Sequence, residues 1–392
     1  MIFKSLLAAL PIQLIGCVLG LCAMGLCGQA SANHPSDSFR IIAADKSGQK
    51  ILSLRVTRPK GQVKIEQERS IPVDFAPSSI AYEPKRGMVY AIGSGDLGKS
   101  QSTFASIATE FGESKRPSEG LRIVGQVSHP IRPGYSSVDR TGQYLLTSNY
   151  QTGEVSVLAI RDDGLIGNIT YQTTTPKPEA HCILTTPDNR FAYVPSVKEN
   201  NALAQYSFDA TSGTLAPLTP LDAIPPAMFG PRHVAYHPSL PIAYFSNEQQ
   251  LGISVYEIAK GGQLIDRQHA SSMPRRDPYV KGLRGLHASD LVFSPTVGFV
   301  FLAVRDFVGD EDSVFTYRVK NDGRLGLLDR TRVGDIPWKL DLSPNGKMLC
   351  VSETFDNRLS IYHVGNKGEL SFAASCDWDT SVRDMVILPS AD

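Results

Sequence analysis

The chain has 392 residues, of which 42% are hydrophobic and 20% are charged, an ordinary composition for a soluble globular protein. Lysine plus arginine and aspartate plus glutamate balance at 39 each, so the net charge shows neither the basic excess of a nucleic-acid-binding protein nor an acidic tail. We therefore expect no nucleic-acid partner, although overall neutrality is compatible with a locally charged pocket.

The first 32 residues are predicted to be a secretory signal peptide. Lys4 gives a short positive start, the apolar stretch LLAALPIQLIGCVLGLCAMGLC follows, and Ala30-Ser31-Ala32 is a small-residue cleavage site before Asn33. We expect a periplasmic or secreted mature chain that has no membrane contact after cleavage. An uncleaved membrane anchor is the first alternative, because the stretch is long enough to span a bilayer. A lipoprotein box ending at Cys17 is a weaker one.

A unit of roughly 50 residues repeats through the rest of the chain, which indicates a repeat architecture. Each unit opens with a strand, a tight turn and a second strand. β-branched and aromatic residues alternate along these strands, and turn-forming residues separate them. The blocks lie at residues 77–94, 134–150, 180–197, 231–248, 288–306 and 337–354.

Two more short strands complete each unit, as in EVSVLAI (154–160) followed by LIGNITYQ (165–172). Seven units of four antiparallel strands predict an all-β, seven-bladed β-propeller. The first unit, residues 41–73, lacks an opening strand. We expect residues 384–389 to supply it and close the ring, because closure removes two exposed sheet edges. Residues 33–392 are therefore predicted to form a single domain.

Two segments read as long insertions into this pattern. One is residues 96–120 in the second unit, and the other is residues 268–288 between the fifth and sixth units. The second segment is basic, and we interpret it as a solvated loop, with a contribution to a binding face as the alternative. Its basic residues are Arg275, Arg276, Lys281 and Arg284.

The predicted mature chain keeps only Cys182, Cys350 and Cys376. They are too few and too scattered for a disulfide scaffold or a zinc ribbon. We expect buried strand cysteines. A bridge between Cys350 and Cys376, which fall in the same unit, is the alternative.

Aligning the blocks on their turn residues places four reactive side chains at equivalent positions. His181 and Arg232 lie six residues before the turn, and Glu248 and Arg305 lie ten residues after it. The two strands of a hairpin bring these positions to the same end. The repeat therefore predicts that an imidazole, a carboxylate and two guanidiniums share one face of the molecule. His233 and His237, further along the same strand, are predicted to be structural.

Three blocks of the chain resemble motifs of one family. FGPRHVAYHPSLPIAYFSNE resembles GPRH…P…Y…NE, SNYQTGEVSVLAIRDDG resembles an NY…G…V…DG block, and AHCILTTPDNRFAYVPS resembles a PH…PD…R block. These are motifs of the seven-bladed β-propeller lactonases, which include propeller-type 6-phosphogluconolactonase and carboxy-cis,cis-muconate lactonising enzyme. The resemblance covers about residues 40–390 and implies this fold, with lactone hydrolysis or the reverse cyclisation as the reaction.

The resemblance also implies a site of one histidine, two arginines and one glutamate, matched by His181, Arg232, Glu248 and Arg305. Neighbouring positions depart from the family pattern: Ala180 stands in place of proline, Val304 in place of asparagine and Trp338 in place of arginine. The predicted export also separates this chain from the sugar-phosphate lactones of central metabolism.

Lactone hydrolysis needs a base for water, a stabiliser for the oxyanion and a proton for the leaving alkoxide. Glu248 is the preferred general base, Arg232 and Arg305 suit the oxyanion or an anionic substituent, and His181 suits the leaving oxygen. Structural alternatives are a surface glutamate, inter-blade salt bridges and a hydrogen-bonded histidine. We expect no cofactor and no metal, and a small anionic lactone or sugar acid as substrate. A non-catalytic propeller that binds a ligand or a protein is the rival function.

Overall fold

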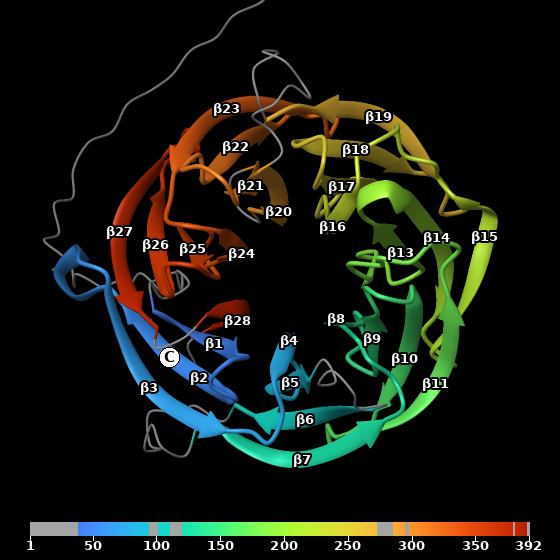
Figure 1. The fold of residues 1–392 in the computed structure, drawn as a ribbon, viewed down its shortest axis with the longest axis horizontal. Helices are drawn as coiled ribbons and strands as arrows, with labels where there is room; N and C mark the ends of the chain where they lie inside the picture. Colours follow the sequence, from blue (N-terminus) through green and yellow to red (C-terminus); the bar gives the residue numbers. More distant parts are fainter. Residues whose placement is uncertain are drawn as a thin grey trace, which may run out of the picture. The chain divides into compact units, whose positions relative to one another are not determined.

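The computed structural model describes residues 38–93, 101–109, 120–272, 285–294, 298–378 and 381–389. These residues form seven four-stranded antiparallel sheets, which Figure 1 shows as the blades of a ring. Innermost strands of neighbouring blades contact one another around most of the axis. The seven-bladed β-propeller that the repeat predicts is therefore confirmed.

The first three blades have the following strands, in order from the axis outward. Blade 1 consists of β28 (Val382–Pro389), β1 (Phe39–Asp45), β2 (Lys50–Thr57) and β3 (Lys64–Pro72). Blade 2 consists of β4 (Pro77–Glu83), β5 (Met88–Gly93), β6 (Ser102–Ala108) and β7 (Arg122–His129). Blade 3 consists of β8 (Tyr135–Val138), β9 (Tyr144–Ser148), β10 (Glu154–Ile160) and β11 (Ile166–Thr174).

The remaining blades follow the same order. Blade 4 consists of β12 (Leu184–Thr185), β13 (Phe191–Ser196), β14 (Ala202–Asp209) and β15 (Thr214–Asp222). Blade 5 consists of β16 (Pro231–Tyr236), β17 (Ile242–Asn247), β18 (Ile253–Ile258) and β19 (Leu264–Ala270). Blade 6 consists of β20 (Leu286–Phe293), β21 (Phe299–Asp306), β22 (Ser313–Val319) and β23 (Leu325–Arg332). Blade 7 consists of β24 (Pro337–Leu342), β25 (Met348–Glu353), β26 (Arg358–Val364) and β27 (Leu370–Asp377). Short 3-10 helices lie at Pro59–Gly61 and Lys198–Asn200.

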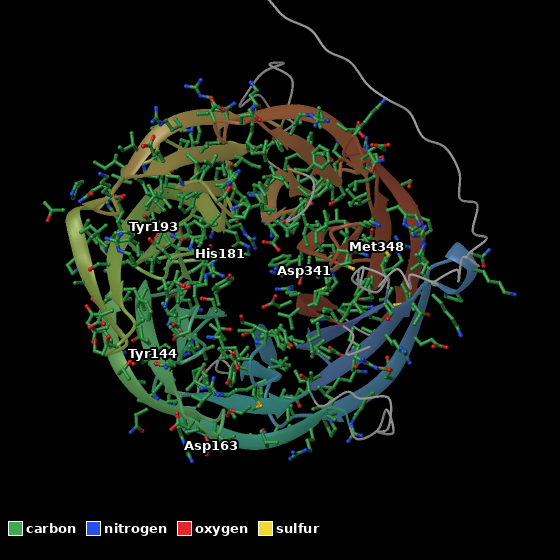
Figure 2. The ribbon with its side chains drawn as sticks, turned by 180° about the vertical axis from the view of Figure 1, so that it is seen from behind. Tyr144, Asp163, His181, Tyr193, Asp341 and Met348 are labelled. Carbon is green, nitrogen blue, oxygen red and sulfur yellow. The ribbon has the colours of Figure 1, made fainter. Side chains whose placement is uncertain are left out.

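Apolar layers between neighbouring blades form the core. Strand β21 is buried along its whole length, because side chains on both of its faces meet another blade. Val300 and Leu302 pack in the cluster shared with blade 5, whereas Phe299 and Phe301 pack in the cluster shared with blade 7. Figure 2 shows side chains filling the spaces between the sheets.

Tyrosines on second strands tie neighbouring blades together. The Tyr193 hydroxyl donates a 2.7 Å hydrogen bond to the carbonyl of Gly262, in an outer turn of blade 5. Gly262 has a φ of 90°, and a Cβ there would lie 2.3 Å from the ring of Phe191, so both its conformation and its neighbours require glycine. The same contact joins Tyr90 to Gly164 and Tyr244 to Gly323.

The C-terminal strand closes the ring, as the missing opening strand of the first unit predicts. β28 pairs antiparallel with β1 in a register from Phe39 opposite Pro389 to Asp45 opposite Val382. It begins at Val382, two residues before the predicted start. The two ends of the described chain therefore build one blade.

One predicted insertion is wrong. Residues 96–120 contain β6 (Ser102–Ala108), which pairs with β5 and β7 and is the third strand of blade 2. Both faces of this strand are buried, so its sequence, which begins Ser-Thr-Phe-Ala-Ser, does not alternate between polar and apolar residues. A search for that alternation therefore misses the strand. In the second segment, β19 ends at Ala270 and β20 begins at Leu286. The four basic residues of that segment lie outside the described residues.

All three cysteines outside the predicted signal peptide are free. Cys182 and Cys350 are buried and Cys376 is half-buried, so the alternative of a Cys350–Cys376 bridge is not observed. The predicted signal peptide, residues 1–32, lies outside the described residues. Within the part of the chain that is described, no helix is long and apolar enough to cross a membrane.

Deleting residues 384–392 should destabilise the whole ring. The deletion removes most of β28, including the buried side chains of Met385 and Leu388. Loss of two such side chains corresponds to about 4–10 kcal/mol, which is comparable with the whole stability of a domain. We expect a much lower melting temperature by circular dichroism. Deleting only residues 390–392, beyond β28, is the control, and equal melting of both truncations would contradict closure.

Candidate active site

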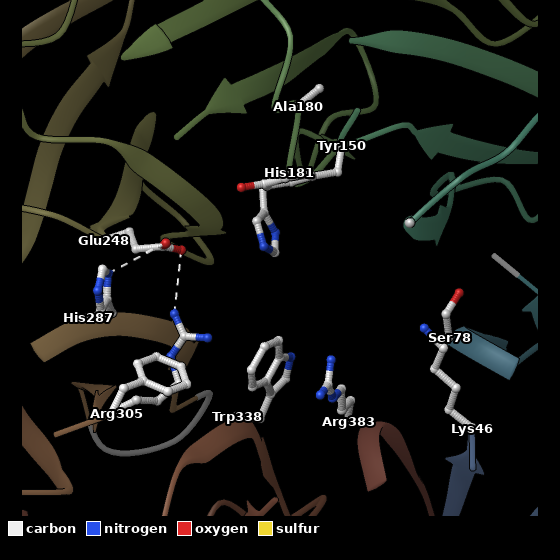
Figure 3. Close-up of a pocket in the computed structure, with 12 residues that line it drawn as sticks. Lys46, Ser78, Tyr150, Ala180, His181, Glu248, His287, Arg305, Trp338 and Arg383 are labelled. Atoms are coloured by element: carbon white, nitrogen blue, oxygen red, sulfur yellow. Dashed lines mark ion pairs between the residues drawn. The ribbon is translucent and has the colours of Figure 1, made fainter. Parts of the chain in front are cut away.

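A cavity of about 490 Å³ opens on the axis of the ring, and all seven blades contribute to its wall (Figure 3). Its lining residues are Lys46, Ser78, Gly134, Tyr150, Ala180, His181, Glu248, His287, Arg305, Phe307, Trp338 and Arg383. A smaller cavity of about 50 Å³ shares five of these residues. It is lined in addition by Tyr135, Arg232, His233, Lys339 and Asp384.

The repeat explains why these residues meet. The second residue of an innermost strand reaches a cavity in blades 1, 2, 5, 6 and 7, where it is Arg383, Ser78, Arg232, His287 and Trp338. The residue directly after a second strand does so in blades 1, 5 and 6, where it is Lys46, Glu248 and Phe307. Both positions lie at the same end of the inner hairpin. Sequence analysis missed Lys46, Ser78 and Arg383, although they occupy these same repeat positions.

The four residues singled out in the sequence form one cluster. Arg232 Nε lies 2.9 Å from Glu248 Oε2, and Arg305 Nη2 lies 3.4 Å from the same oxygen. His181 joins the cluster through His233, whose Nε2 lies 3.3 Å from Arg232 Nη1 and 3.2 Å from His181 Nδ1. The four side chains therefore lie on one face, as the repeat predicts, although Arg232 lines only the smaller cavity, whereas His181, Glu248 and Arg305 line the larger one.

The guanidinium groups of Arg232 and Arg305 are buried, so keeping them charged costs free energy but strengthens their attraction for an anion. Arg232 is fully buried and Arg305 is 3% exposed. Burial lowers the pKa of both guanidiniums, and the Glu248 carboxylate opposes the shift. An arginine starts from so high a pKa that both side chains stay charged. Arg232 Nη2 and Arg305 Nε have no hydrogen-bond acceptor among the described residues, whereas Arg232 Nε faces Glu248 Oε2. The cluster therefore retains N–H donors for an anionic ligand.

Trp338 links three guanidiniums. The Cζ atoms of Arg305 and Arg383 each lie 4.6 Å from the centre of its ring, and that of Arg232 lies 5.7 Å from it. An aromatic face attracts cations, so the ring holds these side chains close together despite their like charges. The tryptophan that replaces the arginine of the family motif is thus part of the cationic wall.

A second layer of polar side chains lies beneath the cavity, one from each blade. Each of these residues directly follows the position that is occupied by Ser78 in blade 2 and by Arg232 in blade 5. They are Ser79, Tyr135, Cys182, His233, Asp290, Lys339 and Asp384. Charged contacts run through it, from His233 Nδ1 to Asp290 Oδ1 at 2.7 Å and from Asp290 Oδ2 to Lys339 Nζ at 3.1 Å. The position five residues before each aligned turn gives six of these residues; Asp384 lies on the C-terminal strand, which has no aligned turn after it.

No metal-ligand set is found in the described part of the chain, where no group of three or more His, Cys, Asp or Glu side chains could hold an ion. What the cavity offers is a wall of cationic donors, one carboxylate and two imidazoles, those of His181 and His287. This combination can bind an anion and move a proton.

The chain matches the family described as "Lactonase, 7-bladed beta-propeller" over residues 40–380. A 6-phosphogluconolactonase of Yersinia pestis (strain Pestoides F) is 27% identical over 254 residues, which cover 64% of this chain and 72% of the relative. A 6-phosphogluconolactonase of Pectobacterium carotovorum is also 27% identical over 254 residues, covering 64% and 73%.

Solved structures share the fold. The periplasmic gluconolactonase PpgL of Pseudomonas aeruginosa has a TM-score of 0.77 at 20% identity and covers 90% of this chain and 99% of its own. A putative 6-phosphogluconolactonase of Bacteroides fragilis has a TM-score of 0.75 at 18% identity, covering 91% and 100%. At these identities the likeness supports the architecture.

Replacing Glu248 by glutamine should destabilise the protein. The change keeps the shape of the side chain but leaves the buried Arg232 without its counter-ion, and breaking a buried ion pair costs about 3–5 kcal/mol. We expect a clear fall in melting temperature, measured by differential scanning calorimetry. Glu66→Gln, which breaks the exposed pair with Lys64, is the matched control and should leave the melting temperature unchanged. Equal melting of the Glu248→Gln protein and wild type would show that the pair contributes nothing.

Proposed function

The chain belongs to the seven-bladed β-propeller lactonase family, and we propose that it hydrolyses an anionic lactone, a cyclic ester that also carries an acidic group. The observation that carries this proposal is the axial cavity, in which Lys46, Arg305 and Arg383 face a single carboxylate, that of Glu248. A positive cavity wall favours a negatively charged substrate.

Arg232 and Arg305 are proposed to stabilise the oxyanion that forms when water attacks the lactone carbonyl. Arg232 Nη2 and Arg305 Nε are buried and have no acceptor among the described residues, which supports this role, because preorganised donors in a water-poor site stabilise developing charge most strongly. Glu248 lies between the two guanidiniums and holds them in position. The proposed reaction uses only side chains of this protein, and we include in it that no added metal ion is needed.

The contacts favour His181 as the group that takes a proton from the attacking water. The sequence favours Glu248 for this step, and that prediction stays untested. One oxygen of Glu248 is shared by two arginines. The other accepts a hydrogen bond from Gln249 Nε2 at 3.2 Å and lies 3.7 Å from His287 Nδ1. His181 uses only Nδ1 for hydrogen bonding within the described residues. Its Nε2 is therefore the better candidate for a base.

The wall opposite Glu248 is proposed to bind the acidic group of the substrate. Figure 3 shows Arg383, Lys46 and Ser78 together on this side of the cavity. Arg383 is exposed and rests on the ring of Trp338, and within the described residues it has no carboxylate in salt-bridge distance. A planar guanidinium of this kind suits a carboxylate or a phosphate.

We also propose that the protein is exported, with residues 1–32 as the cleaved signal peptide. The charged start, the apolar stretch and the small-residue cleavage site support this, as does the likeness to a periplasmic gluconolactonase. Expression of the full-length chain in a Gram-negative host should yield periplasmic protein whose N-terminal sequence starts at or close to Asn33. An intact Met1 terminus on cytosolic protein would contradict export.

A lactone panel tests the reaction. Purified protein should hydrolyse at least one carboxylated or phosphorylated lactone, measured as acid release in weak buffer, and a chelator should leave the rate unchanged. Loss of activity with chelator would mean that a metal takes part. A panel that is bound but not hydrolysed would favour the rival, a non-catalytic binding propeller.

The same panel tests the proposed acid-binding wall through Arg383→Leu. A lost charge-assisted hydrogen bond costs about 1.5–3 kcal/mol, so the KM for an anionic lactone should rise about 10–100-fold. The KM for a neutral lactone of the same ring size should not change. Equal effects on both substrates would remove Arg383 from substrate recognition.

A further inference from the structure

We infer that Asp290 and His233 are positioning residues that determine which nitrogen of His181 carries its proton, leaving Nε2 bare in the cavity. The three side chains form a hydrogen-bonded chain from blade 6 through blade 5 to blade 4. This inference rests on the proposed function, because it makes His181 the proton acceptor of lactone hydrolysis.

The chain of contacts is short and buried. His233 Nδ1 lies 2.7 Å from Asp290 Oδ1, and His233 Nε2 lies 3.2 Å from His181 Nδ1. His233 is 8% exposed and Asp290 is 4% exposed. His181, at the end of the chain, is half-buried and lines the cavity. Buried hydrogen bonds of this kind hold side chains in a single geometry.

The Asp290 carboxylate sets the direction of these hydrogen bonds, because it accepts the Nδ1 proton of His233, and Arg232 agrees with it. Arg232 Nη1 lies 3.3 Å from His233 Nε2, and a guanidinium can only donate. His233 Nε2 must therefore be an acceptor, so the ring proton sits on Nδ1 and is donated to Asp290. Nδ1 of His181 faces the same lone pair of His233 and must also donate. The single ring proton of neutral His181 is then on Nδ1, and its Nε2 has a free lone pair.

The surroundings keep both histidines neutral. Burial lowers the pKa of His233 to about 4, and the positive charge of Arg232 adds to this shift. Burial also lowers the pKa of His181 well below its usual value, and Arg232, His233 and Arg305 act in the same direction. The edge of the Tyr150 ring, 5.7 Å away between centroids, completes these surroundings. A neutral imidazole at neutral pH can accept a proton.

Asp290 is held ionised at the other end of the chain. Burial alone would raise its pKa, but Lys339 and the hydrogen bond from His233 outweigh burial and lower the pKa below its usual range. The backbone N–H groups of Leu291 and Leu340 donate to its two oxygens at 3.0 and 3.1 Å. Asp290 therefore stays an acceptor for the Nδ1–H of His233.

The proton balance of the reaction follows from this arrangement. Nε2 of His181 takes a proton from water as the water oxygen bonds to the lactone carbonyl carbon. The ring C–O bond then breaks, and the imidazolium gives that proton to the leaving alkoxide, which restores neutral His181. No proton moves to His233 or Asp290; their role is to orient the ring and stabilise its transient charge.

Asp290→Asn tests the inference, because an amide cannot accept on both sides. The charged ammonium of Lys339 demands the amide oxygen, which turns the amide NH₂ toward His233. His233 Nδ1 must then accept and its Nε2 must carry the proton, which gives up the longer contact of 3.3 Å with Arg232 Nη1. The proton of His181 must then move to Nε2. We expect kcat to fall about 10²–10⁴-fold, the usual contribution of general acid–base catalysis, with little change in KM.

The tautomer of His181 is the measurement that separates the two cases, because it would not change if Asp290 had only a structural role. Long-range ¹H–¹⁵N correlation spectra of histidine-labelled protein report it, with the His181 signals identified by their loss in His181→Gln. Wild type should carry the proton on Nδ1, and Asp290→Asn should carry it on Nε2. The pH profile of wild-type kcat/KM should stay flat as the pH falls to 6.5 and drop only below it, because protonation of His181 removes the base.

Asp341→Asn is the matched control. Asp341 is an aspartate of another innermost strand, β24, and it accepts hydrogen bonds from the backbone N–H groups of Leu342 and Ile387. The same chemical change there should alter neither the His181 tautomer nor kcat. An Nε2 proton on His181 in wild type, or an unchanged tautomer in folded Asp290→Asn, would overturn the inference. If wild type hydrolyses no lactone, the proposed function fails, while the spectra still decide the tautomer.

Discussion

Ring closure by β28 and β1 is the constraint on which the rest of this structure depends. Each blade buries its apolar faces only against its two neighbours, so a gap would expose both the core and two sheet edges. Closure also completes the cavity, because Arg383 lies on β28 and Lys46 follows β1. The same pairing that stabilises the fold thus brings the chain ends into the site.

Charged side chains are buried around the axis of the ring, where apolar side chains would give a more stable protein. Arg232, Asp290 and Lys339 are removed from water to a large extent, and moving an ion out of water costs several kcal/mol even after relaxation. Pairing offsets this cost, but apolar side chains would avoid it. Charges retained at such a cost cluster at functional sites. The side chains that line the cavity offer hydrogen-bond donors to a ligand, and the second layer of polar side chains holds them in place.

Trp338 illustrates how a departure from the family motif is accommodated. The position holds arginine in the motif, and its loss would remove a cation from the cavity wall. Arg383 reaches the same ring from the neighbouring blade, and its guanidinium stacks on Trp338 together with that of Arg305. The aromatic face screens the repulsion between the two cations. The wall keeps its positive character with a different set of residues.

The sequence by itself determined the strand pattern, the seven blades, the closing strand and the face on which His181, Arg232, Glu248 and Arg305 gather, because all of these follow from a local period and a repeat. It misread β6 because a strand buried on both faces does not alternate in polarity. Only the tertiary structure decided which side chains meet across blades, such as Asp290 with His233 and Arg305 with Glu248. These contacts depend on the spacing of blades around the axis and on side-chain reach, which no local pattern contains.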